Sequence, residues 1–235
     1  MRDRHSVTIT PSDRVVHVVD GDLAPQLLDA LLDDALDSGV GIDTETSGLS
    51  PLTARLEVVS LATRRHIVVV CLEQGQLAPL VCQLLLRPDI LKIFHHALFD
   101  AGFLRYHWKL GIQNVFCTKV AARLVGTDRN PRLEFLAETL LGRQINKGEQ
   151  LSKWSARPLS DRQVHYAVAD VAYLHELSSV LKRRLAEQGQ WQLFETCMQF
   201  LPARVDLALM GLDDVFAYDI GTRGVWQPRE GPDSI

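Results

Sequence analysis

The 235-residue sequence lacks a hydrophobic run of membrane-spanning length, since its longest, residues 67–72, has six residues, whereas a membrane helix needs about 20. Its charged start, residues 1–5, leads into no hydrophobic segment, so no secretory signal is expected. Cysteine is scarce: the four cysteines form no C-x-x-C pair, and no histidine pair has zinc-finger spacing. Widely separated thiols are typical of proteins in a reducing compartment. We therefore expect a cytoplasmic protein without a membrane partner.

An excess of basic residues is also absent. Lysine and arginine number 25 against 29 aspartates and glutamates, which gives a formal net charge of −4. This balance argues against a protein that binds nucleic acid through a generally basic surface. With 46% hydrophobic and 23% charged residues, the composition is that of a globular protein and excludes collagen, coiled coil and disorder.

Hydrophobic periodicity predicts strands interleaved with helices. The expected strands are residues 15–19, 41–45, 57–63, 66–72 and 90–94. The expected helices are residues 23–36, 77–86, 97–107, parts of 124–141, and 160–187, the last beginning with a Ser-x-x-Gln capping box. Residues 142–158 show no periodicity and are expected to form a loop. This order predicts an α/β sheet domain.

Asp43 and Glu45 lie two residues apart on an expected strand, so their side chains share one face. Two carboxylates on a buried face repel each other and lose solvation, and a cation between them would offset both costs. A strand end that faces water would explain the same pattern. The spacing alone leaves both interpretations open.

Further carboxylates lie on expected helices. Asp100 falls in the first turns of helix 97–107, where its charge suits the helix dipole. Tyr166 and Asp170 are four residues apart and therefore share a helix face. Each has a structural alternative: helix stabilisation for Asp100, and a tyrosine at the core edge beside a solvated aspartate for the pair. His95 and His96 should point to opposite faces of a strand, so we do not expect them to bind one ion.

Taken together, these four carboxylates and one tyrosine have the composition of a site for hard cations. Oxygen ligands favour Mg²⁺ or Mn²⁺ over zinc. Two such ions about 4 Å apart can stabilise both the attacking and the leaving oxygen of a phosphodiester. Two divalent ions would also offset the formal charge of −4, so the acidic balance does not exclude a phosphate substrate.

The sequence resembles the DEDD superfamily of 3′-5′ exonucleases, in the subgroup with a tyrosine in the third motif. The matching segments are D-T-E-T-S-G-L at 43–49, H-H-A-L-F-D at 95–100, Y-A-V-A-D at 166–170, and K-x-x-Q-x-S-x-W-x-x-R-P-L-S at 147–160. The last segment resembles ribonuclease D. The resemblance spans residues 14 to 190 and implies an α/β, ribonuclease H-like (DnaQ-like) fold, with a mixed sheet flanked by helices.

The resemblance also implies roles for individual residues. Asp43, Glu45, Asp100 and Asp170 would hold two Mg²⁺ or Mn²⁺ ions, and Tyr166 would orient the attacking water. Leu49 occupies the position that wedges against the terminal base, and His96 could reach the terminal sugar. The full set of expected substrate-binding residues is Thr44, Leu49, His96, Phe99, Trp154 and Arg157. Core packing remains an equal alternative for Phe99, and anchoring of the loop remains one for Trp154.

One departure concerns length. Ribonuclease D carries helical domains after the catalytic one, whereas about 50 residues follow the third-motif helix here. We therefore expect an exonuclease domain at residues 1–190, with a helix and tail at 191–235 packed on it. The expected activity is hydrolysis of single-stranded nucleic acid, RNA favoured over DNA, from the 3′ end to nucleoside 5′-monophosphates, by a monomer or homodimer. The alternatives are a DNA-directed exonuclease and a catalytically silent binding module.

Overall fold

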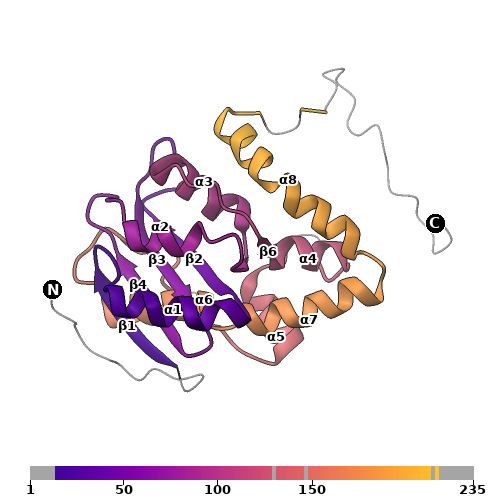
Figure 1. Ribbon diagram of the computed structural model, residues 1–235, viewed down its shortest axis with the longest axis horizontal. Helices are drawn as coiled ribbons and strands as arrows, with labels where there is room; N and C mark the ends of the chain where they lie inside the picture. Colours follow the sequence, from indigo (N-terminus) through magenta and orange to yellow (C-terminus); the bar gives the residue numbers. More distant parts are fainter. Residues whose placement is uncertain (1–13, 129–130, 146–147, 213–214, 217–235) are drawn as a thin grey trace.

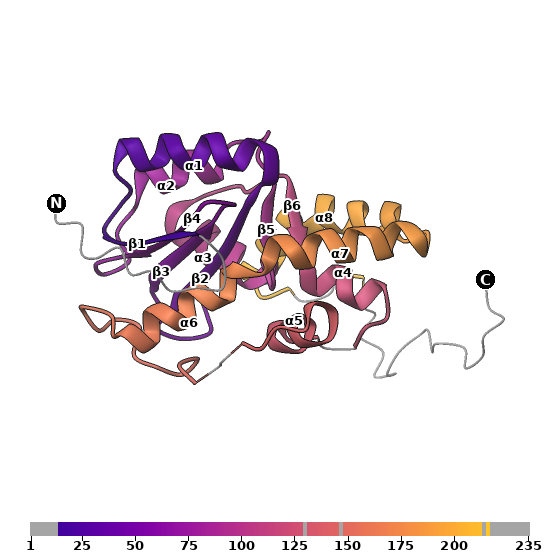
Figure 2. The same ribbon diagram turned by 90° about the horizontal axis from the view of Figure 1, so that it is seen from below.

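A computed structural model of the chain describes residues 14–128, 131–145, 148–212 and 215–216. Lys147 and most of the expected C-terminal tail (213–214 and 217–235) lie outside the described residues. Figures 1 and 2 show one sheet with helices on both of its faces. The strands are β1 (Val15–Asp20), β2 (Val40–Thr46), β3 (Leu56–Ala62), β4 (His66–Cys71), β5 (Lys92–Phe94) and β6 (Val115–Cys117). The helices are α1 (Pro25–Ser38), α2 (Pro79–Leu85), α3 (Ala97–Trp108), α4 (Thr118–Leu124), α5 (Leu133–Leu141), α6 (Asp161–Ala172), α7 (Leu174–Glu187) and α8 (Trp191–Leu209).

The sheet is mixed, with the strand order β1-β4-β3-β2-β5-β6. Strands β2, β3 and β4 pair antiparallel, whereas β1 pairs parallel with β4, and β5 pairs parallel with both β2 and β6. All seven residues of β3 are buried, because it has a strand on each side and helices over each face. The expected mixed sheet flanked by helices is confirmed. Among the described helices, none combines the length and the apolar character that a membrane crossing requires.

Each face of the sheet has its own hydrophobic core. Helices α1, α2 and α3 cover one face, with Leu31 and Phe103 among the buried residues. Helices α6 and α7 cover the other face, with Val168 among the buried residues. Helix α8 lies beside α3 and β6 and contributes Leu201 to the first core and Phe194 to the second.

The expected helix 160–187 is wrong in one respect: it is two helices, α6 and α7, interrupted at Tyr173, whose φ is −103° and ψ is 1°. Both helices bury apolar side chains against the same core, so the apolar pattern runs through the break and hides it. Strand β6 and helix α4 were not expected from the sequence. A strand of three residues is too short to show a period.

The expected capping box at the start of α6 is confirmed. The Ser160 Oγ accepts a hydrogen bond from the Gln163 backbone N–H at 3.3 Å, and the Gln163 Oε1 accepts one from the Ser160 N–H at 3.0 Å. The first turn of the helix that carries Tyr166 and Asp170 is therefore closed by two reciprocal bonds.

Replacing the capping serine should destabilise the fold. We expect Ser160→Ala to lower the free energy of unfolding by about 1 kcal/mol, because a backbone N–H loses its acceptor. For a protein of this size the loss corresponds to a fall in Tm of roughly 2–4 °C, measurable by calorimetry. Ser179→Ala on the exposed surface of α7 is the matched control and should change the stability by less than about 0.5 kcal/mol. Equal Tm values for the two variants would contradict the expectation.

A buried lysine provides a pH-dependent prediction. Lys92 is fully buried and its Nζ donates to the carbonyl oxygens of Arg87 at 2.6 Å and Ile90 at 2.8 Å. Burial lowers the pKa of Lys92 from 10.5 to about 8. Between pH 8 and 10.5 the unfolded chain therefore binds more protons at this residue than the folded chain, and stability gains as the pH rises. We expect the Tm of the wild type to rise relative to that of Lys92→Met across this window. If the difference in Tm between the wild type and Lys92→Met stays constant with pH, this prediction is wrong.

Candidate active site

Three carboxylates converge on one face of the sheet. Ligand oxygens of Asp43, Glu45 and Asp170 all lie within 4.8 Å of one another. Asp43 and Glu45 come from β2 and are partly buried, and Asp170 comes from α6, which packs on this face, and is 5% exposed. Two of the acids therefore face a helix and a third acid instead of open water. Such close, partly dehydrated like charges need a proton or a cation.

Asp100 lies beside this group and is held by Thr44. The Thr44 backbone N–H and Oγ1 donate to the Asp100 Oδ1 at 3.0 and 2.7 Å. Asp100 is 3% exposed, and its burial raises the pKa of its carboxyl to about 7. The nearby charge of Asp170 acts in the same direction, whereas the hydrogen bonds from Thr44 oppose the rise. Thr44 is itself buried and directs its hydroxyl hydrogen at Asp100.

Tyr166 is placed among the same acids. It lies one helical turn before Asp170, is 5% exposed, and forms a side-chain hydrogen bond with that aspartate. Burial and the charges of Asp170, Glu45 and Asp43 raise the pKa of its hydroxyl above the usual value of 10.0. The phenol therefore stays protonated at neutral pH and can serve as a hydrogen-bond donor.

His96, Phe99 and Leu49 lie nearer the surface. His96 precedes α3, is exposed, and stacks on Phe99 with ring centroids 6.2 Å apart and planes 16° apart. Burial of part of the ring lowers the pKa of His96, and the charges of Lys119 and Arg123 add to the effect, so its imidazole is neutral at pH 7. Leu49 follows β2 and is 88% exposed.

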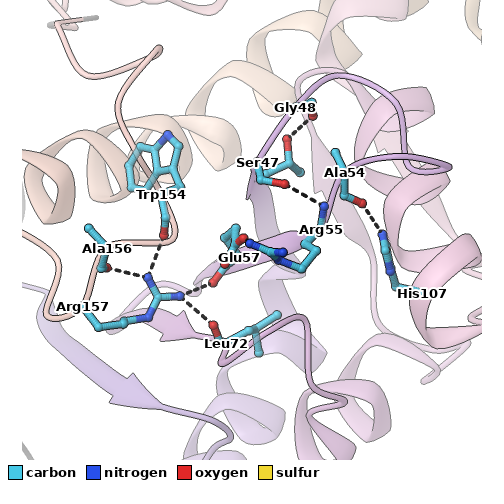
Figure 3. A network of polar contacts seen from close by, with 11 residues as sticks. Ser47, Gly48, Ala54, Arg55, Glu57, Leu72, His107, Trp154, Ala156 and Arg157 are labelled. Carbon is cyan, nitrogen blue, oxygen red and sulfur yellow. Dashed lines mark hydrogen bonds and ion pairs between the residues drawn. The ribbon is translucent and has the colours of Figure 1, made fainter.

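Trp154 and Arg157, two further expected substrate contacts, lie on the loop of residues 148–160. Trp154 is 2% exposed and its ring centroid lies 5.7 Å from that of Tyr166, a placement that supports the alternative of a loop anchor. Arg157 is half-buried, and Figure 3 shows its guanidinium directed at backbone carbonyl oxygens.

Two residues near the site were not assigned a role from the sequence. Glu57 is 2% exposed within the apolar strand β3 and pairs with Arg55 at 3.2 Å (Figure 3). A lone acid inside an apolar run was the signal that could have identified it. Gln163 was expected only as a cap, yet its Nε2 also donates to the Ser152 Oγ at 3.0 Å and the Lys153 carbonyl at 3.2 Å. No local pattern predicts these loop contacts.

A cavity lies away from the acids. A cavity of about 1090 Å³ opens at the amino ends of β5 and β6, where Leu91, Val115, His175 and Trp191 contribute to its walls. The described residues that line it include none of the four acids.

Comparisons with known proteins agree with this geometry. Residues 22–186 match a family described as 3′-5′ exonuclease. Ribonuclease D of Gluconacetobacter diazotrophicus is 37% identical over 153 residues, which are 64% of this chain and 39% of that protein. The chain thus spans about two-fifths of the length of the curated relatives that it matches.

Solved structures extend the likeness to three dimensions. Brucella melitensis NrnC bound to pGG is 38% identical, with a TM-score of 0.79 over 86% of this chain and 98% of that one. NrnC has also been solved with bound Mg²⁺, with a TM-score of 0.77. Escherichia coli RNase D shares the fold at 22% identity, with a TM-score of 0.65 over 84% of this chain and 50% of that one.

This fold family implies divalent metal ions, and the acidic group offers carboxylate oxygens that could hold a metal ion. The family match extends over 165 of the 235 residues and includes every acid of the site, and the chain therefore belongs to the 3′-5′ exonuclease family.

Proposed function

We propose that this chain is a metal-dependent exonuclease that removes nucleoside 5′-monophosphates from the 3′ end of single-stranded RNA. The observation that carries the proposal is the convergence of Asp43, Glu45 and Asp170 within 4.8 Å, beside the buried Asp100. A silent binding module would have no use for such a cluster, because each added carboxylate repels the others and the phosphates of the ligand.

The residues present fit divalent cations. The cluster offers carboxylate oxygens and no sulfur or imidazole, a donor set that suits Mg²⁺ or Mn²⁺. We infer that Asp43, Glu45, Asp100 and Asp170 hold two such ions. When bound, they would supply positive charge to the reacting phosphate and lower the pKa of the attacking water.

The chain's own groups would orient the reactants. Tyr166 keeps its hydroxyl hydrogen at neutral pH and lies against the acids, so it can align the attacking water. Leu49 is exposed three residues after the end of β2, the strand of Asp43 and Glu45, and can pack on the terminal base; the His96–Phe99 stack can contact the terminal sugar. Thr44 acts on the site by holding Asp100.

Short RNA is the substrate that we favour. Ribonuclease D relatives point to RNA, and the NrnC structure that matches 86% of this chain was solved with pGG. We therefore include pGG among the expected substrates, together with the 3′ ends of longer single strands. RNA would be distinguished from DNA through its 2′-hydroxyl.

We further infer that residues 1–190 form the catalytic domain and that α8 packs on it, which the contacts of α8 with α3 and β6 support. The four free cysteines suit a reducing compartment such as the cytoplasm. The monomer and the homodimer remain the expected oligomeric states.

The decisive experiment uses 5′-labelled RNA and DNA of one sequence, and pGG, each with Mg²⁺, Mn²⁺ or EDTA. A metal-dependent ladder that shortens from the 3′ end of RNA supports the proposal, and faster loss of DNA would assign the enzyme to DNA. Absence of shortening with either metal, with strand binding retained, would favour the silent binding module.

Removing an acid should abolish cleavage. We expect Asp43→Ala and Asp170→Ala to lower kcat/KM by more than about a hundredfold. Mutating a residue that only hydrogen-bonds to a metal ligand already lowers metal affinity or activity by about 10- to 100-fold, and these variants lose a ligand itself. Asp89→Ala, at an exposed aspartate paired with Arg87, is the control and should cleave normally. Near-normal turnover by Asp43→Ala would refute the assigned site.

Tyr166→Phe tests the orienting role of the hydroxyl. We expect kcat to fall roughly tenfold to hundredfold, because the attacking water is no longer aligned, while the Kd for RNA stays within about twofold. Single-turnover cleavage and fluorescence anisotropy measure the two quantities. Tyr106→Phe, at a partly buried tyrosine of α3, should leave both unchanged. A weakened Kd with unchanged kcat would instead assign Tyr166 to binding.

A further inference from the structure

Among the described residues, the two terminal nitrogens of the Arg157 guanidinium donate only to backbone carbonyls, and its buried Nε–H has no hydrogen-bond partner (Figure 3). Its Nη1 donates to the carbonyl oxygens of Trp154 at 2.6 Å and Ala156 at 2.8 Å, and its Nη2 donates to those of Glu57 at 2.8 Å and Leu72 at 2.7 Å. The two terminal nitrogens carry four hydrogens, which these four carbonyls match one for one. No terminal N–H is left for the two-pronged contact with a phosphate that arginine makes in nucleic-acid sites.

The four carbonyls belong to two separate parts of the chain. Trp154 and Ala156 lie on the 148–160 loop, whereas Glu57 is in β3 and Leu72 directly follows β4. The Leu72 N–H donates to the Glu57 carbonyl at 2.9 Å, so Arg157 binds the last rung of the β3–β4 ladder. Within the part of the chain that the structure describes, Arg157 forms no ion pair with a carboxylate. Arg157 therefore links the backbone of the 148–160 loop to the backbone at the ends of β3 and β4.

One end of this link leads to an acid of the site and the other to Tyr166. On the sheet side, the residue after Glu57 is Val58, which pairs with Glu45 across β2 and β3. On the loop side, the carbonyl held by Arg157 belongs to Trp154, whose buried ring contacts the ring of Tyr166. Arg157 therefore connects the strand that pairs with one acid to the side chain that packs on the tyrosine.

We propose that Arg157 is a positioning residue, which sets the place of Tyr166 relative to the acids through Trp154. The inference rests on the proposed exonuclease function and assigns Arg157 a role different from substrate binding. Lysine cannot replace it, because one ammonium group has three donors on a single nitrogen and cannot span two pairs of carbonyls.

The kinetic test compares Arg157→Lys and Arg157→Ala with the wild type on single-stranded RNA. We expect kcat to fall roughly tenfold to hundredfold, since small misplacement of a reacting group costs that much, with KM for RNA within about twofold. Added methylguanidinium should restore part of the kcat of Arg157→Ala and nothing in Asp43→Ala. Arg87→Lys, at an exposed arginine paired with Asp89, should match the wild type.

A raised KM with kcat retained would overturn the proposal in favour of substrate binding, and unchanged values of both would overturn it altogether. If Arg157→Ala does not fold, Arg157→Lys keeps the charge and carries the test. Hydrogen exchange separates this inference from the exonuclease proposal: residues 148–166 should lose protection in Arg157→Lys whether or not the protein cleaves RNA. Unchanged protection there would exclude the link even in an inactive protein.

Discussion

The packing of α6 against one face of β2, β3 and β4 is the contact on which the site depends. It places Asp170 within 4.8 Å of Asp43 and Glu45, so folding itself brings like charges together. Two carboxylates about 4 Å apart repel by roughly 4 kcal/mol at an effective dielectric constant of about 20. Each buried Val or Leu returns about 1.5–3 kcal/mol. Burial of Val168, Val171 and the neighbouring apolar residues of this core opposes the repulsion.

Burial raises the pKa of two polar groups of the site, with different consequences for their charge. Asp100 and Tyr166 are both nearly inaccessible, and burial raises the pKa of each. For the tyrosine this means a hydroxyl that keeps its hydrogen. For Asp100 it means a carboxyl whose charge depends on what lies beside it, with Thr44 favouring the charged form. A cation at the acids would favour the charged form as well.

The 148–160 loop has no regular secondary structure, yet it is tied to its surroundings on several sides. Arg157 joins it to the ends of β3 and β4, Trp154 buries its ring against Tyr166, and Gln163 of α6 bonds to its backbone. A loop held at this many points can support the tyrosine side of the site with the precision that catalysis requires.

The sequence alone was sufficient for features that local spacing encodes. The two acids on one strand face, the tyrosine four residues before Asp170, the capping box of α6 and a sheet domain with interleaved helices all follow from residue type and period. The mixed sheet was implied by the resemblance to the DEDD exonucleases. The two α6 bonds of the capping box form between residues three apart, which is why a local pattern could predict them. The strand β6 could not be predicted this way because its three residues are too few to show a period, and the break at Tyr173 could not because the apolar pattern continues through it.

Only the tertiary structure decided the partners of Trp154 and Arg157 and the bond between Thr44 and Asp100. Arg157 lies 100 residues from Glu57 and 85 from Leu72 along the chain, and Thr44 lies 56 residues from Asp100. An arginine in a loop has the same local sequence whether it binds a phosphate or a row of carbonyls. The choice depends on which strand ends the fold brings within about 3 Å of its nitrogens. That distance is set by the packing of helices on the sheet, which no local pattern records.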